Sequence, residues 1–275
     1  MSIPIWGNIK PSVGFWQNYT HPLSQGLIWH WLFNEGAWVI AKDINKNLNG
    51  TLTNWPIWTN GKFWRTIWFD GVDDYVEVPY NSVLSMLGDM TICLWIKVTD
   101  FANYNWLVWK TSGSWPAPYD FYLWQTSGLP TFFRGSWGTY SYFPGTTAPA
   151  LGIWQHVAIT VNGTVWIQYL NGAINGSGAL TATPIDGWRS LRIGTRDDLV
   201  TKMKGSIDDV RIYNRGLSQQ EIRRIYTEPF VDILSPNKYQ LLSNNVATIV
   251  SIPFVARKPY MTNIANLRNT ASINF

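Results

Sequence analysis

Alternating apolar and polar residues in the segment KGSIDDVRIY, residues 204–213, predict a β-strand late in the chain. Val210 and Ile212 recur at every second position, which is the pattern of a strand with one face in a core. On a regular strand Asp208 would share the face of these two apolar residues. A carboxylate buried there needs a cation or several backbone N–H donors.

The residues after this strand predict a short helix. Ser218 is placed as the N-cap, and Glu221 three positions later completes a capping box. Leu217 and Ile222 have the spacing of a hydrophobic staple across the helix start. The helix is expected to end before Pro229, which cannot continue it.

Further strands are predicted upstream. The run MTICLWIKV, residues 90–98, is not strongly polar on either face, since Thr91 and Lys97 are its only polar residues, as expected for a central strand of a sheet. The run VAITVNGTVWIQYLNGAI, residues 157–174, predicts two successive hairpins, because each Asn-Gly pair favours a tight two-residue turn.

The segment IDDVRIYNRGLSQQEI resembles the closing strand and helix of laminin-G-like, concanavalin A-like jelly-roll domains. Upstream segments agree in the same order: HWLFNEGAWVIAKDINKNLNGTLTNWPIW, GKFWRTIWFDGVDDYVEVP, and MTICLWIKV followed by WQHVAITVNG. The resemblance covers residues 26–228. It implies an all-β jelly-roll sandwich of two antiparallel sheets with one short C-terminal helix.

Segments on either side of this domain are predicted to be extended arms. Residues 1–25 are rich in Pro, Gly and Asn, and residues 229–275 contain many Asn and Ser. The flanks NYTHPLSQGLIWHWLFNEGA and IYTEPFVDIL look like those of laminin-G-like proteins encoded by bacteriophages. This likeness implies a place on a virion surface or outside the cell, with neighbouring virion subunits or further copies of the chain held through the arms.

The amino-acid composition limits the kinds of partner and metal site that we expect for this protein. Charged residues are 14% and aromatic residues 16% of the 275 residues, with 18 Trp, so the chain has much apolar surface to bury or to offer. The net charge of +4 comes from scattered basic residues, and a nucleic-acid interface would require them to cluster. Because Cys93 is the single cysteine, an intrachain disulfide and a thiolate zinc site are excluded.

The N-terminal residues do not have the pattern of a secretory signal, because no basic start is followed by an apolar run. Export would then depend on another route, such as release of virions by lysis. No stretch approaches the ~18 apolar residues that span a bilayer, so we expect no membrane insertion.

Residues 101–150 are the least regular part and are dense in aromatic residues, Gly, Pro and Ser. Such connections carry the functional surface of many jelly rolls. Aromatic rings can pack on the faces of sugar rings, while most tryptophans in a sandwich serve packing. We therefore expect a glycan to contact Trp115, Tyr119, Trp137 and Tyr140.

The resemblance also implies a structural calcium ion. Carried over by position, it points to Asp208 of the closing strand, assisted by Asn34, Glu35 and Asp43. Calcium takes six to eight oxygen ligands, several of them backbone carbonyls. The alternative is that Asp208 accepts backbone N–H bonds and Asp43 caps a turn.

Catalysis finds little support in the sequence. A retaining glycosidase needs two carboxyl groups about 5 Å apart that flank one bond. Asp73 and Asp74, or Asp208 and Asp209, are adjacent in the chain, and adjacent strand residues point to opposite faces. We therefore expect a protein that is not an enzyme.

Trp29, Trp38, Trp55 and Trp64 stand where similar sequences usually have glycine, as in EGAG or GKFG in place of EGAW and GKFW. Glycine at such positions allows a positive φ or a close approach of strands. One hypothesis is that the gene reads UGA as glycine and that the translation shows tryptophan instead. The rival hypothesis is that the tryptophans are real and are accommodated at the surface.

The function expected from these features is glycan binding and adhesion by a virion surface protein. Weak single sites would gain avidity when many copies are displayed. The alternatives are a structural decoration or tail subunit held by its arms without sugar binding, and a glycoside hydrolase.

Overall fold

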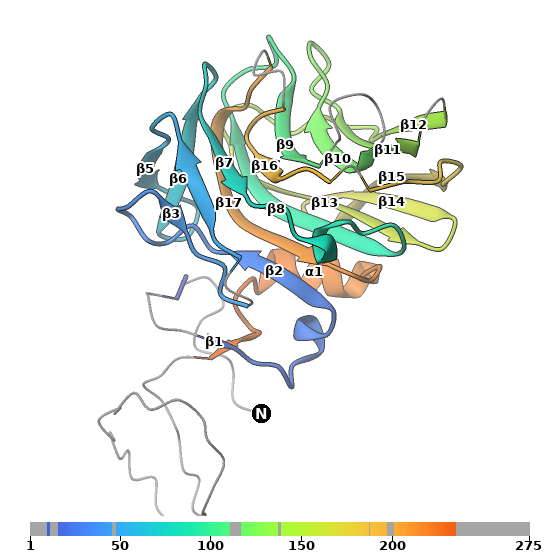
Figure 1. The fold of residues 1–275 in the computed structure, drawn as a ribbon, viewed down its shortest axis with the longest axis horizontal. Helices are drawn as coiled ribbons and strands as arrows, with labels where there is room; N and C mark the ends of the chain where they lie inside the picture. The colour runs from blue at the N-terminus through green and yellow to red at the C-terminus, as the bar shows by residue number, and fades with distance from the viewer. Residues whose placement is uncertain are drawn as a thin grey trace, which may run out of the picture. The chain divides into compact units, whose positions relative to one another are not determined.

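The computed structural model describes residues 10–11, 16–45, 48–110, 117–136, 139–186, 188–196 and 201–234; the side chains of residues 16, 117, 139, 140 and 234 are not described. Within these residues the chain forms two antiparallel β-sheets stacked face to face (Figure 1). The predicted all-β sandwich with two antiparallel sheets and one short helix is confirmed.

The first sheet, called here the β8 sheet, contains the strands predicted from the clearest patterns. Its order is β15 (Ala173–Ala179), β14 (Val165–Leu170), β13 (Gln155–Asn162), β8 (Met90–Val98), β17 (Lys204–Tyr213), β6 (Arg65–Asp70) and β5 (Ile57–Asn60), and β2 (Leu27–Trp31) also pairs with β17. β8 lies between β13 and β17, as expected for a central strand.

The second sheet, called here the β10 sheet, is built largely from the aromatic part of the chain. Its order is β12 (Thr139–Pro144), β11 (Pro130–Ser136), β10 (Ala117–Leu123), β9 (Asn105–Trp109), β16 (Leu191–Ile193), β7 (Tyr75–Val78), β4 (Gly50–Thr53) and β3 (Ile40–Ala41). Two 3-10 helices, η1 (Pro22–Ser24) and η2 (Ser82–Leu84), lie in the connections.

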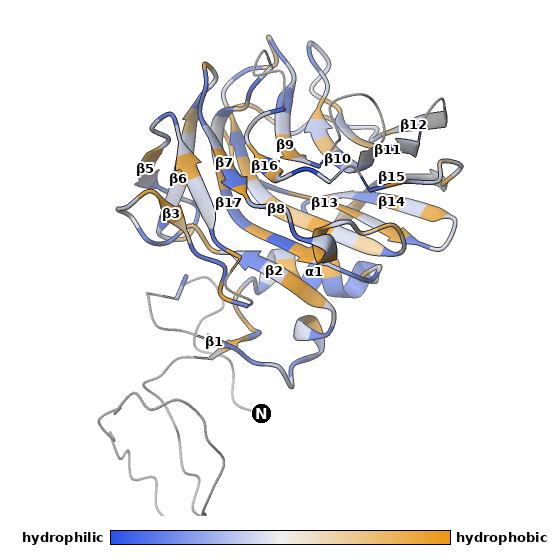
Figure 2. Ribbon diagram, viewed as in Figure 1, coloured by the Kyte–Doolittle hydropathy of each residue, from blue (hydrophilic) through white to orange (hydrophobic). Residues whose placement is uncertain are grey.

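The main hydrophobic core lies between the two sheets. Ile92 and Leu94 of β8 and Val210 and Ile212 of β17 are fully buried there with residues of the β10 sheet such as Phe121. Figure 2 shows hydrophobic and hydrophilic residues alternating along β17. The inward orientation predicted for Val210 and Ile212 is therefore confirmed.

The alternation in β17 is interrupted by a bulge at the two aspartates. The register with β8 shifts between Asp208 and Arg211, and Asp209 has a φ of 49°. Ile207 and Val210 can therefore both enter the core, whereas Asp208 lies opposite Trp95. The expectation that Asp208 shares the face of Val210 is wrong, because a bulge inserts one extra residue into the alternation.

Helix α1 (Gln219–Thr227) follows β17 and begins as predicted. The Ser218 hydroxyl accepts a hydrogen bond from the Glu221 N–H, and the Glu221 carboxylate accepts one from the Ser218 N–H, which completes the capping box. The helix ends at Thr227, two residues before Pro229. Within the described residues no helix is both long and apolar enough to cross a lipid bilayer.

Both predicted hairpins form. In the first, Asn162 pairs with Val165, so Gly163 and Thr164 make the two-residue turn between β13 and β14; in the second, Asn171 and Gly172 make the turn between β14 and β15. Asn171 and Gly172 have φ values of 52° and 77°, the left-handed conformation that a tight two-residue turn requires.

Parts of both predicted arms pack against the sandwich. β1 (Trp16–Gln17) pairs with β18 (Ile233–Leu234), and Phe230 and Ile233 bury their side chains against Leu32. Lys10 is also buried. The rest of the C-terminal extension, residues 235–275, lies outside the described residues.

The four unusual tryptophans occupy different environments. Trp29 is fully buried in β2, and its indole N–H has no hydrogen-bond partner. Trp38 and Trp55 are 81% and 86% exposed and have φ values of 82° and 73°. Trp64 is 64% exposed and does not have a positive φ.

A left-handed backbone is strained for a bulky side chain and unstrained for glycine. The backbone at Trp38 and Trp55 therefore favours the recoding hypothesis at these two positions. Trp188 shares both features, with 74% exposure and a φ of 56°, although its sequence context did not mark it. At Trp64 the exposed indole without a positive φ is equally compatible with recoding and with a real tryptophan accommodated at the surface.

Trp38→Gly and Trp55→Gly are each expected to stabilise the protein. Each substitution removes left-handed strain and loses little packing, so we expect the free energy of unfolding to rise by about 1 kcal/mol. Urea denaturation of the purified variants measures this change.

The matched control is Trp64→Gly, an exposed tryptophan without a positive φ, for which we expect no gain. If Trp38→Gly and Trp55→Gly are no more stable than this control, the strain is absent. The intact mass of protein from its native source then decides the codon question, because each glycine lowers the mass by the difference between the two residues.

Candidate functional site

The two sheets differ in what covers their outer faces. Ile222 and Ile225 of α1 pack on the outer face of the β8 sheet against Cys93 and Tyr213. A separate aromatic cluster lies on the outer face of the β10 sheet. A ligand can therefore reach a broad sheet face more readily on the β10 sheet.

The aromatic cluster is built by alternation along β9 to β12. Phe121 and Leu123 of β10 enter the core, so Tyr122 between them points outward. Trp106 of β9 lies opposite Tyr122, with ring centroids 4.4 Å apart. We call the following residues the aromatic face: Tyr104, Trp106, Tyr122, Trp124, Phe133 and Tyr142.

Trp124 and Tyr142 are the solvent-exposed members of this face, at 36% and 41%. Their rings meet edge to face, with centroids 5.8 Å apart and an interplanar angle of 87°. They border a shallow, mainly apolar pocket of about 310 Å³, whose other lining residues are Ser127, Leu129, Thr131 and Pro144. Such a pocket offers ring faces and edges to an amphipathic ligand.

Polar groups fix the inner part of the aromatic face. The indole N–H of Trp106 donates to the Thr201 hydroxyl at 2.7 Å, and the Arg196 guanidinium lies 5.7 Å from the Trp106 ring centroid. Burial raises the pKa of Tyr122, so this phenol stays protonated. The inner rings therefore form a rigid floor beside the exposed pair.

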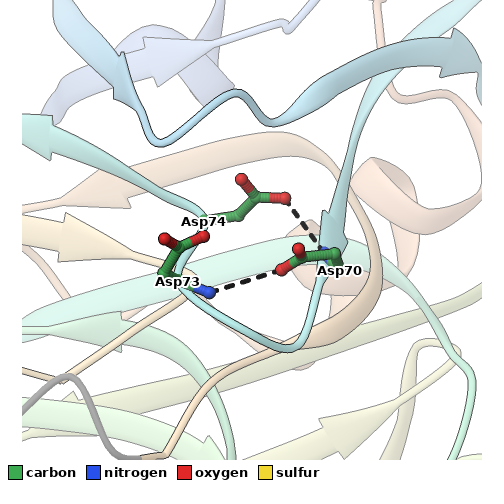
Figure 3. A group of neighbouring side chains, drawn as sticks. All are labelled: Asp70, Asp73 and Asp74. Atoms are coloured by element: carbon green, nitrogen blue, oxygen red, sulfur yellow. Dashed lines mark hydrogen bonds between the residues drawn. The ribbon is translucent and has the colours of Figure 1, made fainter.

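Three aspartates gather in the turn between β6 and β7 (Figure 3). Asp70 Oδ1 accepts from the Val72 N–H at 2.7 Å, and Asp74 Oδ2 accepts from the Asp70 N–H at 3.0 Å. Among the described residues, one group of three His, Cys, Asp or Glu side chains has potential metal-ligand atoms within 4.8 Å of one another, and it consists of Asp70, Asp73 and Asp74. Their hydrogen bonds are those of a capped turn.

Asp74 Oδ1 is buried without a hydrogen-bond partner. Burial, together with the neighbouring Asp70 and Asp73 carboxylates, raises the pKa of Asp74 to about 6, against the opposing hydrogen bond from the Asp70 N–H. Asp74 therefore releases its proton less readily in the folded protein than in an unfolded chain.

The residues expected to hold calcium each have partners within the protein. Asp208 is fully buried and forms an ion pair with the Lys10 ammonium. Asn34 donates to the Pro11 carbonyl at 2.5 Å, and Glu35 accepts from the Lys42 N–H at 2.9 Å.

Asp43 serves as a loop cap. Its Oδ1 accepts from the backbone N–H groups of His30 and Asn45, both at 3.0 Å, and its Oδ2 accepts from the Leu48 N–H at 3.3 Å. This is the alternative role considered for Asp43. For Asp208 the partner is the Lys10 ammonium, a cation supplied by the chain itself.

Asp209 belongs to a buried network on the outer face of the β8 sheet. Arg211 Nε lies 3.1 Å from Asp209, and its Nη1 lies 3.2 Å from both carboxylate oxygens of Asp232. His30 Nε2 lies 2.5 Å from Asp209. Burial alone would raise the pKa of Asp209, but Arg211 and His30 hold it well below its usual range.

Comparison with protein families matches residues 70–223 to the concanavalin A-like lectin/glucanase superfamily. The chain belongs to this superfamily. No curated protein matched the sequence.

Solved structures with the same fold are distant in sequence. The binding domain of Paraclostridial mosquitocidal protein 1 gives a TM-score of 0.62 at 19% identity, covering 75% of this chain and 53% of that chain. Domain 4 of an extracellular arabinanase from Geobacillus stearothermophilus gives 0.59 at 19% identity, covering 73% and 98%. Trypanosoma rangeli sialidase gives 0.58 at 16% identity, covering 75% and 33%.

Identities this low show the shared fold alone. Our concanavalin A-like chain spans about half of the first of these structures and a third of the sialidase. It matches nearly the full length of the arabinanase domain.

The candidate carboxylate pairs of this concanavalin A-like domain are engaged elsewhere. Asp208 and Asp209 are held by different cations, Lys10 and Arg211. Asp74 accepts a hydrogen bond within the turn of Figure 3. His156 is buried beside Trp95, and burial lowers its pKa to about 4, as expected of a packed histidine.

Of the four residues predicted to contact a glycan, the structure describes the side chain of one. Tyr119 is fully buried and donates its hydroxyl hydrogen to the Leu84 carbonyl at 2.8 Å, so its assignment to a surface ligand is wrong. Trp115 and Trp137 lie outside the described residues. Tyr140 lies in β12 opposite Gly135, and its side chain is not described.

The exposed pair, Trp124 and Tyr142, lies in the aromatic segment 101–150 but is not among the four residues expected to contact a glycan. Asp120 could have indicated that Trp124 is exposed, because side chains alternate between the two faces of a strand. Asp120, Tyr122 and Trp124 lie on one face, and Tyr119, Phe121 and Leu123 lie on the other. A charged residue marks the outer face of a strand. The aromatic density of the segment hid this alternation.

Asp74→Asn is expected to stabilise the protein at pH 8 and not at pH 4. Because the folded-state pKa is raised from 3.8 to about 6, the stability of the protein falls as pH rises through this window. Asparagine cannot ionise and keeps an oxygen for the Asp70 N–H. We expect a gain of about 1 kcal/mol at pH 8, because solvent near the turn screens part of the effect.

Chemical denaturation at both pH values measures this difference. Asp73→Asn in the same turn is the matched control and should give a smaller gain, because Asp73 is not buried. An equal gain for Asp74→Asn at pH 4 would show that ionisation is not the cause.

Proposed function

We propose that the protein binds glycans reversibly through the aromatic face, without chemical conversion. The observation that carries this proposal is the exposed pair Trp124 and Tyr142 at the edge of an apolar pocket. A sugar ring presents C–H groups on its faces and hydroxyls at its rim, so it can pack on an indole while bonding to polar neighbours. Ser127 is an exposed residue of the same pocket and carries a hydroxyl, whereas Thr131 is buried and donates its hydroxyl hydrogen to the Leu129 carbonyl at 3.1 Å.

The rigidity of the site also supports binding. The rings contact one another in a continuous series: Trp106 contacts Tyr122, Tyr122 contacts Trp124, and Trp124 contacts Tyr142. Aromatic side chains held by neighbours lose little conformational entropy when a ligand arrives. A shallow site of this kind favours weak individual affinity, which becomes useful when many copies act together.

The fold relatives are consistent with this proposal. The mosquitocidal protein structure is described as a binding domain, and the arabinanase domain was solved in complex with arabinotriose. Our proposal for this chain rests on its own aromatic face, because those relatives share the fold at low identity.

The experiment is a glycan array that includes arabinotriose and other arabino-oligosaccharides, followed by calorimetry with the best ligand. Trp124→Ala and Tyr142→Ala should each weaken binding roughly tenfold, because each removes a stacking surface worth about 1.4 kcal/mol. Circular dichroism should show an unchanged fold, since both side chains are partly exposed.

Trp64→Ala is the matched control, because Trp64 is an exposed tryptophan outside the aromatic face and should leave affinity unchanged. Equal losses in all three variants would refute the assigned site. A protein that binds no glycan would instead fit the structural-subunit alternative, and cleavage of an arrayed glycan would establish a hydrolase.

We further propose that the protein is displayed on a bacteriophage particle or outside the cell. The support is the likeness of the segments around residues 18–37 and 225–234 to phage-encoded laminin-G-like proteins. Mass spectrometry of purified particles should detect this chain in many copies per particle, and its absence from them would refute the virion setting.

A further inference from the structure

The carboxylate of Asp208 is buried on β17 and has a cation supplied by the chain itself. Lys10 Nζ donates to Asp208 Oδ1, although the two residues are 198 positions apart. Both side chains are fully buried. A carboxylate in this position requires a positive charge, because burial without one is strongly unfavourable.

Backbone carbonyls complete the surroundings of the ammonium. Lys10 Nζ also donates to the Phe33 carbonyl at 3.1 Å and to the Arg65 carbonyl at 2.5 Å. These three contacts use all three donors of a lysine. Two carbonyls and a carboxylate are also the types of oxygen that a hard metal cation takes.

The loops around this position are shaped to present oxygen atoms. Phe33 has a φ of 52°, a strained conformation for a bulky residue. At Gly61 an added Cβ would lie 2.8 Å from Asp208 Oδ2, so the close approach needs glycine. Asp208 Oδ2 itself is buried without a partner.

The residue after Lys10, Pro11, also contacts the loop that contains Phe33. The Pro11 carbonyl accepts a hydrogen bond from Asn34, which adjoins Phe33. Burial raises the pKa of Glu35, and the hydrogen bond from the Lys42 N–H and the Lys10 ammonium oppose this rise. Asp208 contacts Lys10 directly and Asn34 contacts the neighbouring Pro11, although the resemblance implied calcium for both.

A calcium ion does not fit beside Lys10. The ammonium occupies the oxygens that would bind the metal, and two buried positive charges would repel each other at this distance. We propose that Lys10 takes the place of calcium at Asp208, so that the native protein needs no metal there, and that neutralising Lys10 lets the same oxygens bind a divalent cation.

The proposal is tested with the full chain by thermal unfolding in EDTA and in excess CaCl₂. Lys10→Met keeps the length of the side chain and removes its charge, so the midpoint in EDTA should fall by roughly 10 °C. Calcium should raise the midpoint of this variant by more than that of the native protein. The additional rise should vanish in the double variant Lys10→Met, Asp208→Asn.

Two results would overturn the proposal. One is a calcium response of the native protein that Asp208→Asn removes, which would place the metal at Asp208 despite Lys10. The other is an equal calcium response in Lys10→Met and in the native protein. A Lys10→Met protein that folds in calcium and not in EDTA would support the proposal.

A measurement on the native protein covers the case in which Lys10→Met does not fold under either condition. Acetylation of surface amines followed by peptide mass spectrometry should modify Lys10 at least roughly tenfold more slowly than Lys204, whose side chain is 47% exposed. The rate at Lys10 should not depend on calcium. Equal rates at the two lysines, or faster modification of Lys10 in calcium, would contradict the proposed exchange.

Discussion

Burial of charge on β17 is the constraint on which much of the structure depends. The strand lies in the middle of the β8 sheet, and every residue from Gly205 to Tyr213 is buried. Its inner face is apolar and packs into the core, but its bulge and outer face carry Asp208, Asp209 and Arg211. These groups must be neutralised by neighbours, because water cannot reach them.

The neutralising partners come from distant parts of the chain. Lys10 pairs with Asp208, His30 contacts Asp209, and Asp232 accepts from Arg211. The two ends of the described region are thus fixed to the same central strand, in addition to the pairing of β1 with β18. Ion pairs of this kind add little net stability, and their value lies in specifying one arrangement of the segments that supply them.

The same arrangement places the buried charges and the proposed binding surface on different sheets. The outer face of the β8 sheet holds charged pairs and is covered by α1, whereas the outer face of the β10 sheet carries the aromatic face. Trp124 and Tyr142 are at its accessible edge, next to rings that are already held by their neighbours. The residues of the aromatic face can therefore vary without disturbing the charges that fix the chain ends.

The resemblance of several ordered segments to laminin-G-like domains predicted the fold class. Local patterns determined the central strands, both Asn-Gly hairpins and the capping box at Ser218, because these features depend on residues close together in the chain. The tertiary structure alone decided that Tyr119 enters the core while Trp124 remains exposed, and that a bulge turns Asp208 away from the face of Val210. It alone also decided that the cation beside Asp208 is Lys10. Burial and charge pairing are set by residues that meet only when the sheets stack, so no local pattern records them.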